Sequence, residues 1–252
     1  MWSERQAIEL FHLVFVAHLG RRVDKALFAI KGGCNLRFFC RSIRYSEDID
    51  IDIRTMAKAT LENNVNTLLR SSPFAQTLRT TQIEVDYITS AKQTDTTQRW
   101  KIGIRLAGGL AIPTKVEFSR RRRLDDDILL EPVDAEIVRT YKLFPVLAPH
   151  YSFEAAFRQT IRALSGRTVT QARDVFDLKL LLDGGAGQEK LPKDIVKELP
   201  QAIENAMSIG FDEFSGQVRA YLTADYQEYY GSREVWEAIQ DGVVRALEER
   251  RS

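Results

Sequence analysis

The segment DIDIDI, residues 48–53, alternates aspartate with isoleucine over six positions. Strict alternation is typical of a β-strand, in which successive side chains point to opposite faces of the sheet. The isoleucines then pack into a core, while Asp48, Asp50 and Asp52 line the other face. Like charges this close repel by about 1 kcal/mol or more per pair unless a cation lies between them. The segment therefore predicts a half-buried strand whose polar face requires positive charge.

A divalent cation is the simplest source of that charge. Mg²⁺ prefers hard oxygen ligands and completes its shell with water and substrate phosphates. Two carboxylates at i and i+2, joined by a third from a neighbouring strand, can hold two such ions for in-line displacement at phosphorus. Glu117 is the best third candidate, because Val116 and Phe118 flank it as apolar neighbours. We predict a two-metal site made by Asp48, Asp50 and Glu117; the alternative is a solvent-exposed acidic edge strand.

A glycine pair, Gly32 and Gly33, lies upstream of the aspartates. It follows an apolar run at residues 27–30, which predicts a strand, and precedes helical spacing at residues 35–43. Glycine lets the backbone approach a ligand closely, and a helix N-terminus offers free N–H groups to a phosphate. The pair is thus a candidate phosphate-binding turn.

Several polar residues near these motifs have both a functional and a structural interpretation. Lys115 can bind a nucleotide phosphate or merely flank Glu117 on its strand. The hydroxyl of Ser46 can contact a phosphate or cap the entry of the strand. Two groups of arginines offer cations to a polyanion or form ordinary solvated surface. They are Arg37, Arg41 and Arg44, which we expect on one helix face, and the run at residues 120–123.

The combination of strand, glycine pair and D-x-D strand resembles the signature of the nucleotidyltransferase superfamily. More closely, KGGCNLRFF with RYSEDIDIDI is similar to the GGTxLRL and RFSEDIDLDI motifs of AbiEii-type toxins, the family that includes the MenT toxins. The likeness resumes at residues 161–182, where IRALSGRTVTQARDVFDLKLLL is similar to the family's ALxxR and RDxxDLxxL motifs.

The resemblance implies transfer of a nucleotide from an NTP to an acceptor hydroxyl, with release of pyrophosphate and with Mg²⁺ as cofactor. The implied acceptor is RNA, namely the 3′ end of tRNA, and the implied protein partner is a cognate antitoxin. The implied site residues are Gly32 and Gly33 at the phosphates, Asp48 and Asp50 at the metals, and Arg173, Asp174 and Asp177 in the second motif, with Arg173 binding nucleotide and Asp174 catalytic.

Two positions depart from the family pattern. Cys34 stands where the family usually has a small hydroxyl residue, and Thr160 stands where it has a lysine. Arg158 or Arg162 would have to supply the lost cation. Two alternatives stay open: a nucleotidyltransferase that acts on a small molecule or a protein hydroxyl, and a degenerate member that binds nucleotide or a partner without turnover.

Composition bounds the class of protein. With 252 residues, 44% hydrophobic and 28% charged, the chain is an ordinary globular protein. A net charge of +1 excludes a global field that would hold it on nucleic acid or on a membrane. Two cysteines, and an apolar N-terminal stretch too short to span a bilayer, predict a cytoplasmic protein without a membrane partner.

Periodicity predicts the architecture, an α/β (α+β) fold in two lobes. We expect a nucleotidyltransferase-like catalytic lobe with a small mixed sheet at residues 1–130, followed by a helical lobe at residues 131–252 that closes the cleft. The expected helices are at residues 4–19, 35–43, 60–69, 155–164, 172–182, 194–207 and 232–249, and the expected strands at 27–30, 48–53, 82–88, 100–106 and 114–119.

Overall fold

The computed structural model describes residues 2–106, 108–122 and 127–251, which form two compact units. The first unit comprises Met1–Arg41 and Tyr45–Tyr151, and the second comprises Ser42–Arg44 and Ser152–Ser252. A seven-stranded mixed sheet with helices makes up the first unit, and helices make up the second. The predicted α/β class is therefore confirmed.

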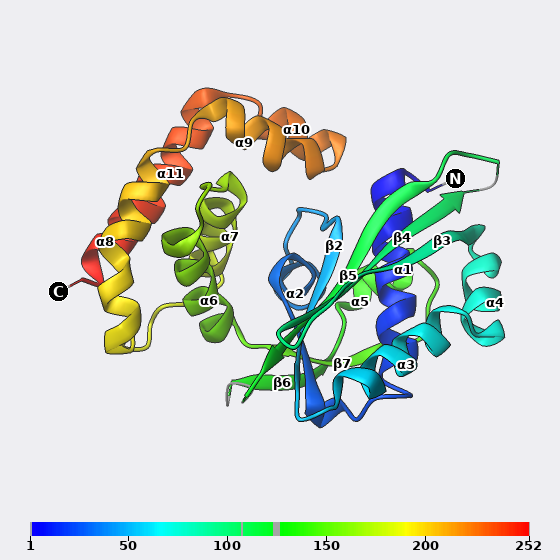
Figure 1. Ribbon diagram of the computed structural model, residues 1–252. Helices are drawn as coiled ribbons and strands as arrows, with labels where there is room; N and C mark the ends of the chain where they lie inside the picture. The colour runs from blue at the N-terminus through cyan, green and yellow to red at the C-terminus, as the bar shows by residue number, and fades with distance from the viewer. Residues whose placement is uncertain (1, 107, 123–126, 252) are drawn as a thin grey trace. The chain divides into compact units, whose positions relative to one another are not determined.

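The first unit runs from α1 to β7 (Figure 1). The predicted lobe boundary at residue 130 falls within β6, and the first unit continues beyond it because β7 joins the sheet. Its elements are α1 (Glu4–Leu19), η1 (Lys25–Leu27), β1 (Phe28–Lys31), α2 (Gly32–Phe39), β2 (Asp48–Arg54), α3 (Lys58–Leu69), α4 (Ser72–Thr80), β3 (Ile83–Gln93), β4 (Thr97–Leu106), β5 (Ile112–Arg121), β6 (Ile128–Pro132), α5 (Ala135–Thr140) and β7 (Leu147–Tyr151).

The strand β2, which carries the alternating aspartates, is the fourth strand in the sheet order β3-β4-β5-β2-β1-β7-β6. It pairs in parallel with β5 and antiparallel with β1. Because both of its edges are hydrogen-bonded, the alternative interpretation as an acidic edge strand is wrong. A central strand has one face in the core, which accounts for its isoleucines.

The core of the first unit lies on the isoleucine face of β2. Ile49, Ile51 and Ile53 are at most 1% exposed and belong to one cluster with residues of α1, α3 and α4. The predicted N-terminal helix is confirmed as α1, which Ser3 begins with a capping box and whose apolar residues are buried in this cluster. The three helices cover the apolar face, so the opposite face of β2 is left to its aspartates.

The helix α2 departs from its predicted bounds. It begins at Gly32 directly after β1 and ends at Phe39, where Cys40 and the positive φ of Arg41 (56°) stop the helical path. The glycine pair is therefore the first turn of the helix and does not precede it. Arg41 and Arg44 lie beyond the helix end, so the predicted basic helix face is wrong.

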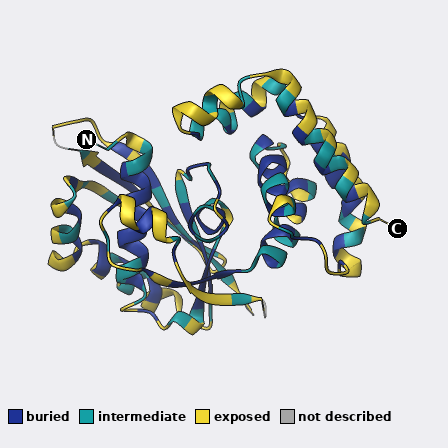
Figure 2. Cartoon of the chain, turned by 180° about the vertical axis from the view of Figure 1, so that it is seen from behind, coloured by how far each residue is buried: buried dark blue, intermediate teal, exposed yellow. Residues whose placement is uncertain are grey.

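The second unit buries its core between α6, α7, α8, α9 and α11 (Figure 2). Phe214 stacks on Trp236 with ring centroids 4.6 Å apart, and Phe176 packs against Phe214. Among the described residues, no helix is long and apolar enough to cross a membrane. The elements are α6 (Phe153–Gly166), α7 (Ala172–Asp183), α8 (Lys193–Met207), α9 (Phe211–Gln217), η2 (Arg219–Tyr221), α10 (Ala224–Tyr229) and α11 (Arg233–Glu249).

A buried carboxylate ties α2 to its neighbours within the first unit. Glu9 of α1, 3% exposed, accepts a hydrogen bond from Arg37 Nε of α2 at 2.6 Å. Tyr141, the residue that ends α5, donates its hydroxyl to the same carboxylate at 2.6 Å. The Arg37 guanidinium also lies 4.7 Å from the Tyr45 ring centroid. Arg37 is therefore a structural residue that fixes the orientation of α2.

We expect Glu9→Ala to lower the free energy of unfolding by about 3 kcal/mol or more, because it leaves the Arg37 guanidinium partly buried without its carboxylate. Tyr141→Phe removes one hydrogen bond and should cost about 1 kcal/mol. Urea unfolding monitored by circular dichroism measures both. Equal stability of Glu9→Ala and the wild type would contradict this role for Glu9.

Candidate nucleotide-binding and metal-binding site

The predicted carboxylates meet at the pairing of β2 with β5. Asp50 is the register partner of Glu117, and Asp48 is the register partner of Lys115. Residues in register project from the same face of a sheet, so all four side chains lie on the face opposite the core. All four are partly exposed. The register therefore puts the three predicted metal ligands and one predicted phosphate ligand on the same face of one strand pair.

The first residue of α2 adjoins this group. Gly32 has a φ of +62°, a conformation that glycine adopts without strain. A Cβ at this position would lie 3.3 Å from Oδ2 of Asp50. The N-cap, Lys31, makes no side-chain capping hydrogen bond. The N-terminus of α2, with Gly33 as its second residue, therefore lies directly beside the Asp50 carboxylate.

Asp52 shares the face but has a different environment. It is 3% exposed, and the Tyr151 hydroxyl donates to its Oδ2 at 2.9 Å. Its Oδ1 receives no well-aligned hydrogen bond, but Lys31 Nζ at 2.7 Å and Arg121 Nε at 3.1 Å lie within ion-pair distance. The two cations neutralise this oxygen by proximity, so the third aspartate of the alternation is a buried structural ion-pair residue.

Cations of the sheet neutralise two of the site carboxylates. Lys115 Nζ lies 2.6 Å from Asp48 Oδ2, and Arg99 of β4 forms an ion pair with Glu117. Arg99 is the register partner of Glu117 across the antiparallel β4–β5 pair. Sequence reasoning missed Arg99, although its alternation with the buried Trp100 marks it as a residue of the polar face. These pairs relieve the repulsion that the alternating aspartates create.

The residue types fit a divalent metal. Among residues 2–106, 108–122 and 127–251, no three His, Cys, Asp or Glu side chains come close enough together to hold a metal ion. The carboxylates of Asp48 and Glu117 are each held by a cation instead. Their oxygens are nevertheless the hard donors that Mg²⁺ prefers. They flank Asp50, whose carboxylate would be in tight contact with a Cβ on Gly32.

Side chains beside and beneath the site hold the entry of β2 in place. The Ser46 hydroxyl donates to the Asp48 carbonyl oxygen at 2.8 Å, and the Cys34 thiol donates to the same oxygen at 3.3 Å. The Thr114 hydroxyl donates to the Glu47 carbonyl oxygen at 2.6 Å. Ser46 and Cys34 are therefore engaged with the backbone of the metal-ligand strand.

His12, which sequence reasoning did not single out, completes this buried layer. Its Nε2 lies 2.8 Å from the Thr114 hydroxyl oxygen, and its Nδ1 lies 3.5 Å from Cys34 Sγ. Because the single Thr114 proton goes to Glu47, Nε2 of His12 must be the donor, which leaves Nδ1 unprotonated. Burial lowers the pKa of His12 to about 3 and raises the pKa of the Cys34 thiol well above its usual value. Both groups are therefore neutral at physiological pH.

The second-motif residues form ion pairs within the second unit. Arg167 Nε lies 2.6 Å from Asp174 Oδ2, and Arg44 Nη2 lies 2.7 Å from Asp177 Oδ2. Burial raises the pKa of Asp174, and the hydrogen bond from Arg167 opposes that shift. Arg173 is partly exposed and, within the described part of the chain, has no hydrogen bond or ion pair. Sequence reasoning missed the pairing of both aspartates with Arg167 and Arg44.

In the run of arginines at residues 120–123, Arg120 and Arg121 contact other residues of the first unit. Arg120 donates to Gln98 Oε1 and to the Met56 carbonyl oxygen. Arg121 is paired with Asp52, as described above. Arg122 is exposed, and Arg123 lies outside the described residues. Two of the three arginines that the structure describes in this run therefore have partners within the sheet and its neighbours.

Thr160, which stands where the family has a lysine, makes a local contact. The Thr160 hydroxyl donates to the Ala156 carbonyl oxygen at 2.8 Å on the same helix, α6. Arg162, one of the two proposed replacements, is paired with Asp194 at 2.5 Å. The Arg162–Asp194 pair links α6 to α8 in the second unit.

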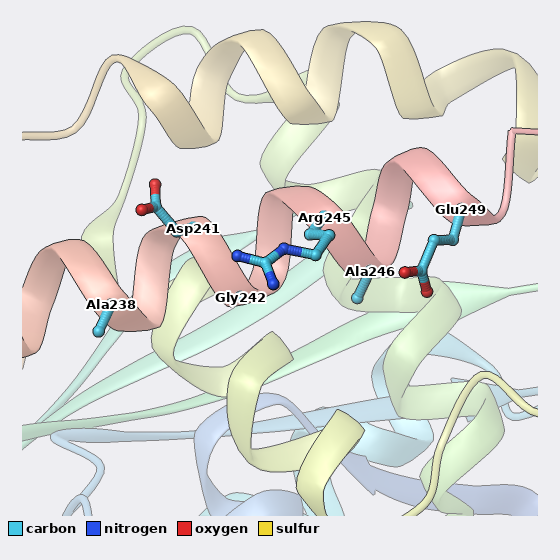
Figure 3. Close-up of a pocket in the computed structure, with 6 residues that line it drawn as sticks. All are labelled: Ala238, Asp241, Gly242, Arg245, Ala246 and Glu249. Carbon is cyan, nitrogen blue, oxygen red and sulfur yellow. The ribbon is translucent and has the colours of Figure 1, made fainter.

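A cavity of about 490 Å³ lies along α11 and contains none of the predicted site residues (Figure 3). All of its lining residues come from one side of that helix, and both signs of charge are present. They are Ala238, Asp241, Gly242, Arg245, Ala246 and Glu249.

Comparison with known proteins supplies the family context of this geometry. A family model described as the nucleotidyl transferase AbiEii toxin of type IV toxin–antitoxin systems matches residues 14–249. No curated protein matches the sequence. JHP933 from Helicobacter pylori has a similar structure, with 17% identity, a TM-score of 0.61, and coverage of 99% of this chain and 96% of that chain. MenT4, a nucleotidyltransferase toxin from Mycobacterium tuberculosis H37Rv, has 15% identity, a TM-score of 0.59, and coverage of 100% of this chain and 96% of that chain. At such identities the likeness shows a shared fold.

The neutral His12 makes stability depend on pH. Its pKa is about 3 in the folded protein and about 6.5 in the unfolded chain, so only the unfolded chain binds the proton between these values. Stability is therefore lost as pH falls below about 6.5, by up to about 1.4 kcal/mol per pH unit. We expect His12→Gln to lose less stability than the wild type between about pH 6.5 and pH 4.5, as measured by urea unfolding. Identical pH profiles of stability for His12→Gln and the wild type would contradict the assignment of a neutral His12. The control is His18→Gln, because His18 is less buried.

Proposed function

The chain belongs to the AbiEii nucleotidyltransferase toxin family, and we propose that it transfers a nucleotide from an NTP to the 3′ end of an RNA, with Mg²⁺ as cofactor. One observation carries this proposal. Gly32 opens α2 beside the Asp50 carboxylate, and Glu117 lies next to Asp50 in the register of β2 and β5. As a nucleotidyltransferase toxin of a type IV toxin–antitoxin system, the protein uses an NTP substrate and has an antitoxin as its counterpart.

Asp48, Asp50 and Glu117 would hold Mg²⁺. When bound, the metal would offset negative charge on the transferring phosphate and orient it for in-line attack. We assign to Glu117 the acceptance of the proton of the acceptor hydroxyl; its partial exposure on the polar face supports this role. The acceptor oxygen then bonds to the α-phosphorus, and the bond from that phosphorus to the leaving pyrophosphate breaks.

The triphosphate would bind at the start of α2. The N–H groups of Gly32 and Gly33 are in the first turn, where a helix has no internal acceptors for them and its dipole attracts anions. Lys115 adds a cation on the same face. We assign Ser46 to support of β2, because its hydroxyl is already bonded to the Asp48 carbonyl oxygen.

For the second unit we propose that Arg173 contacts the nucleotide and that Asp174 takes part in catalysis. This proposal rests on the family motif. Arg173 is a suitable phosphate ligand because, among the described residues, it has no ion pair. The Arg167 guanidinium pairs with the Asp174 carboxylate and holds its orientation.

We propose RNA, and specifically the 3′ end of tRNA, as the acceptor. Two exposed lysines support a polyanionic substrate on the face of the carboxylates. Lys101 is the register partner of Lys115, and Lys92 is the register partner of Arg99. Within the described residues neither lysine has an ion pair, so both can bind phosphates at no cost in internal contacts.

Asp50→Asn tests the proposed chemistry, because it keeps the shape of the side chain and removes its charge. We expect nucleotide transfer to fall by at least about a hundredfold, since metal ligation supplies several kcal/mol of transition-state stabilisation. The assay incubates the protein with each α-labelled NTP, Mg²⁺ and total RNA, and follows the label on tRNA. Transfer at the wild-type rate by a folded Asp50→Asn protein would refute the metal assignment.

The phosphate turn has a matched control in the chain. Gly32 and Gly108 both have positive φ, 62° and 71°, but of the two only Gly32 faces a carboxylate; a Cβ at Gly108 would meet none of the described residues within 4 Å. We expect Gly32→Ala to weaken NTP binding about tenfold or more by crowding Asp50, and Gly108→Ala to leave it unchanged. Calorimetry with Mg²⁺ and each NTP measures the affinities. Equal losses in both variants would remove the special role of Gly32.

The acceptor assignment predicts a salt effect. If Lys92 and Lys101 contact phosphates, the double change to glutamate should weaken tRNA binding, and the log-log dependence of affinity on salt should be about two units shallower. NTP binding should change far less. Filter binding between about 50 and 200 mM salt gives the slope. A wild-type protein that labels a small molecule or a protein, and not RNA, would contradict the proposal.

A further inference from the structure

The polar face of the sheet contains two kinds of carboxylate–cation pair. Asp52 is buried and its partner Lys31 is only slightly exposed, with side-chain exposures of 4% and 17%. The pair of Asp48 with Lys115 is far more open, at 27% and 42%. The pair of Glu117 with Arg99 is similarly open, with side-chain exposures of 22% and 36%. The carboxylate of the first pair is thus shielded from water, whereas water reaches both partners of the other two pairs.

The open pairs are weak enough to be exchanged. An ion pair between partly exposed side chains contributes about 0–1 kcal/mol, whereas breaking a buried pair leaves an uncompensated charge and costs about 3–5 kcal/mol. Lys115 and Arg99 can therefore leave their carboxylates at little cost, whereas Lys31 cannot leave the buried Asp52. The exchangeable pairs are also the ones that hold two proposed metal ligands.

We propose that Lys115 and Arg99 act as exchangeable counter-ions of the site. Without metal they neutralise Asp48 and Glu117; when metal and NTP bind, they leave these carboxylates and bind the triphosphate. The exchange rests on the proposed function and extends it, because Arg99 lies outside the family motifs and becomes a nucleotide-binding residue. It requires no covalent change, since only ion pairs are broken and formed.

The geometry places both cations where this exchange is possible. Lys115 and Arg99 lie on the same sheet face as Asp50, through the register of β5 with β2 and with β4. Asp50 in turn adjoins Gly32, the start of the phosphate-binding turn. Asp48 and Glu117, which flank Asp50, each have a cation of their own that offsets their charge. The same cations become available when a divalent ion supplies that charge.

The test measures two affinities that should move in opposite directions. Removal of the competing cation in Lys115→Met or Arg99→Met should tighten binding of Mn²⁺ alone by about two- to fivefold. The same variants should bind NTP in the presence of Mn²⁺ about tenfold more weakly, because a charged phosphate ligand is lost. Isothermal titration calorimetry gives both values, first with Mn²⁺ alone and then with ATP, GTP, CTP and UTP in turn.

Arg121→Met is the matched control. Arg121 lies on β5 and pairs with Asp52, so its removal deletes a cation of the same face without freeing a proposed metal ligand. We expect Mn²⁺ affinity to stay within about 1.5-fold of the wild type, since a distant exposed charge is largely screened. Lys115→Gln serves as a second variant, and thermal melting verifies that each protein is folded.

The outcomes separate the exchange from the function on which it rests. Tighter Mn²⁺ binding with weaker NTP binding supports the exchange. Mn²⁺ binding that is unchanged or weaker in folded Lys115 and Arg99 variants, with a wild type that binds Mn²⁺, overturns the exchange and leaves the metal site intact. A wild type that binds no Mn²⁺, with or without NTP, overturns the metal assignment itself.

Discussion

The parallel pairing of β2 with β5 is the constraint on which the site depends. The register places Asp50 beside Glu117 and Asp48 beside Lys115, and a slip of one residue would turn every aspartate into the core. The buried isoleucines fix that register, because they have to remain on the apolar face. The same alternation that builds the core therefore also positions the chemistry.

The carboxylates of the polar face are neutralised in two different environments, one buried and one accessible to solvent. Asp52 is itself buried and is held by Lys31, by Arg121 and by the Tyr151 hydroxyl, so it belongs to the framework of the sheet. Asp48 and Glu117 are neutralised by exposed cations and remain accessible. Beneath them, Ser46, Cys34 and Thr114 donate to the carbonyl oxygens of Glu47 and Asp48, and the neutral His12 donates to the Thr114 hydroxyl. This layer steadies the strand without adding charge to the site.

Local sequence predicted the parts of the site that depend on local pattern. The β2 strand follows from alternation and is present, and the glycine pair does lie between a strand and a helix, although it forms the first turn of α2 where we expected it to precede the helix. Arg99 and His12 were missed because their roles depend on partners more than twenty residues away or on another strand. The end of α2 was misplaced because helical spacing continued past Phe39, whereas the backbone turns at Arg41. Short elements such as α4, β6 and α9 carry too few residues for a clear period.

The most direct test of the account is where a metal binds. Crystals of the protein soaked with Mn²⁺ and a non-hydrolysable NTP would show the metal by anomalous scattering. The account predicts anomalous density bounded by Asp48, Asp50 and Glu117, with the triphosphate at the N-terminus of α2. Strong density at another carboxylate group, with none beside Asp50, would contradict it.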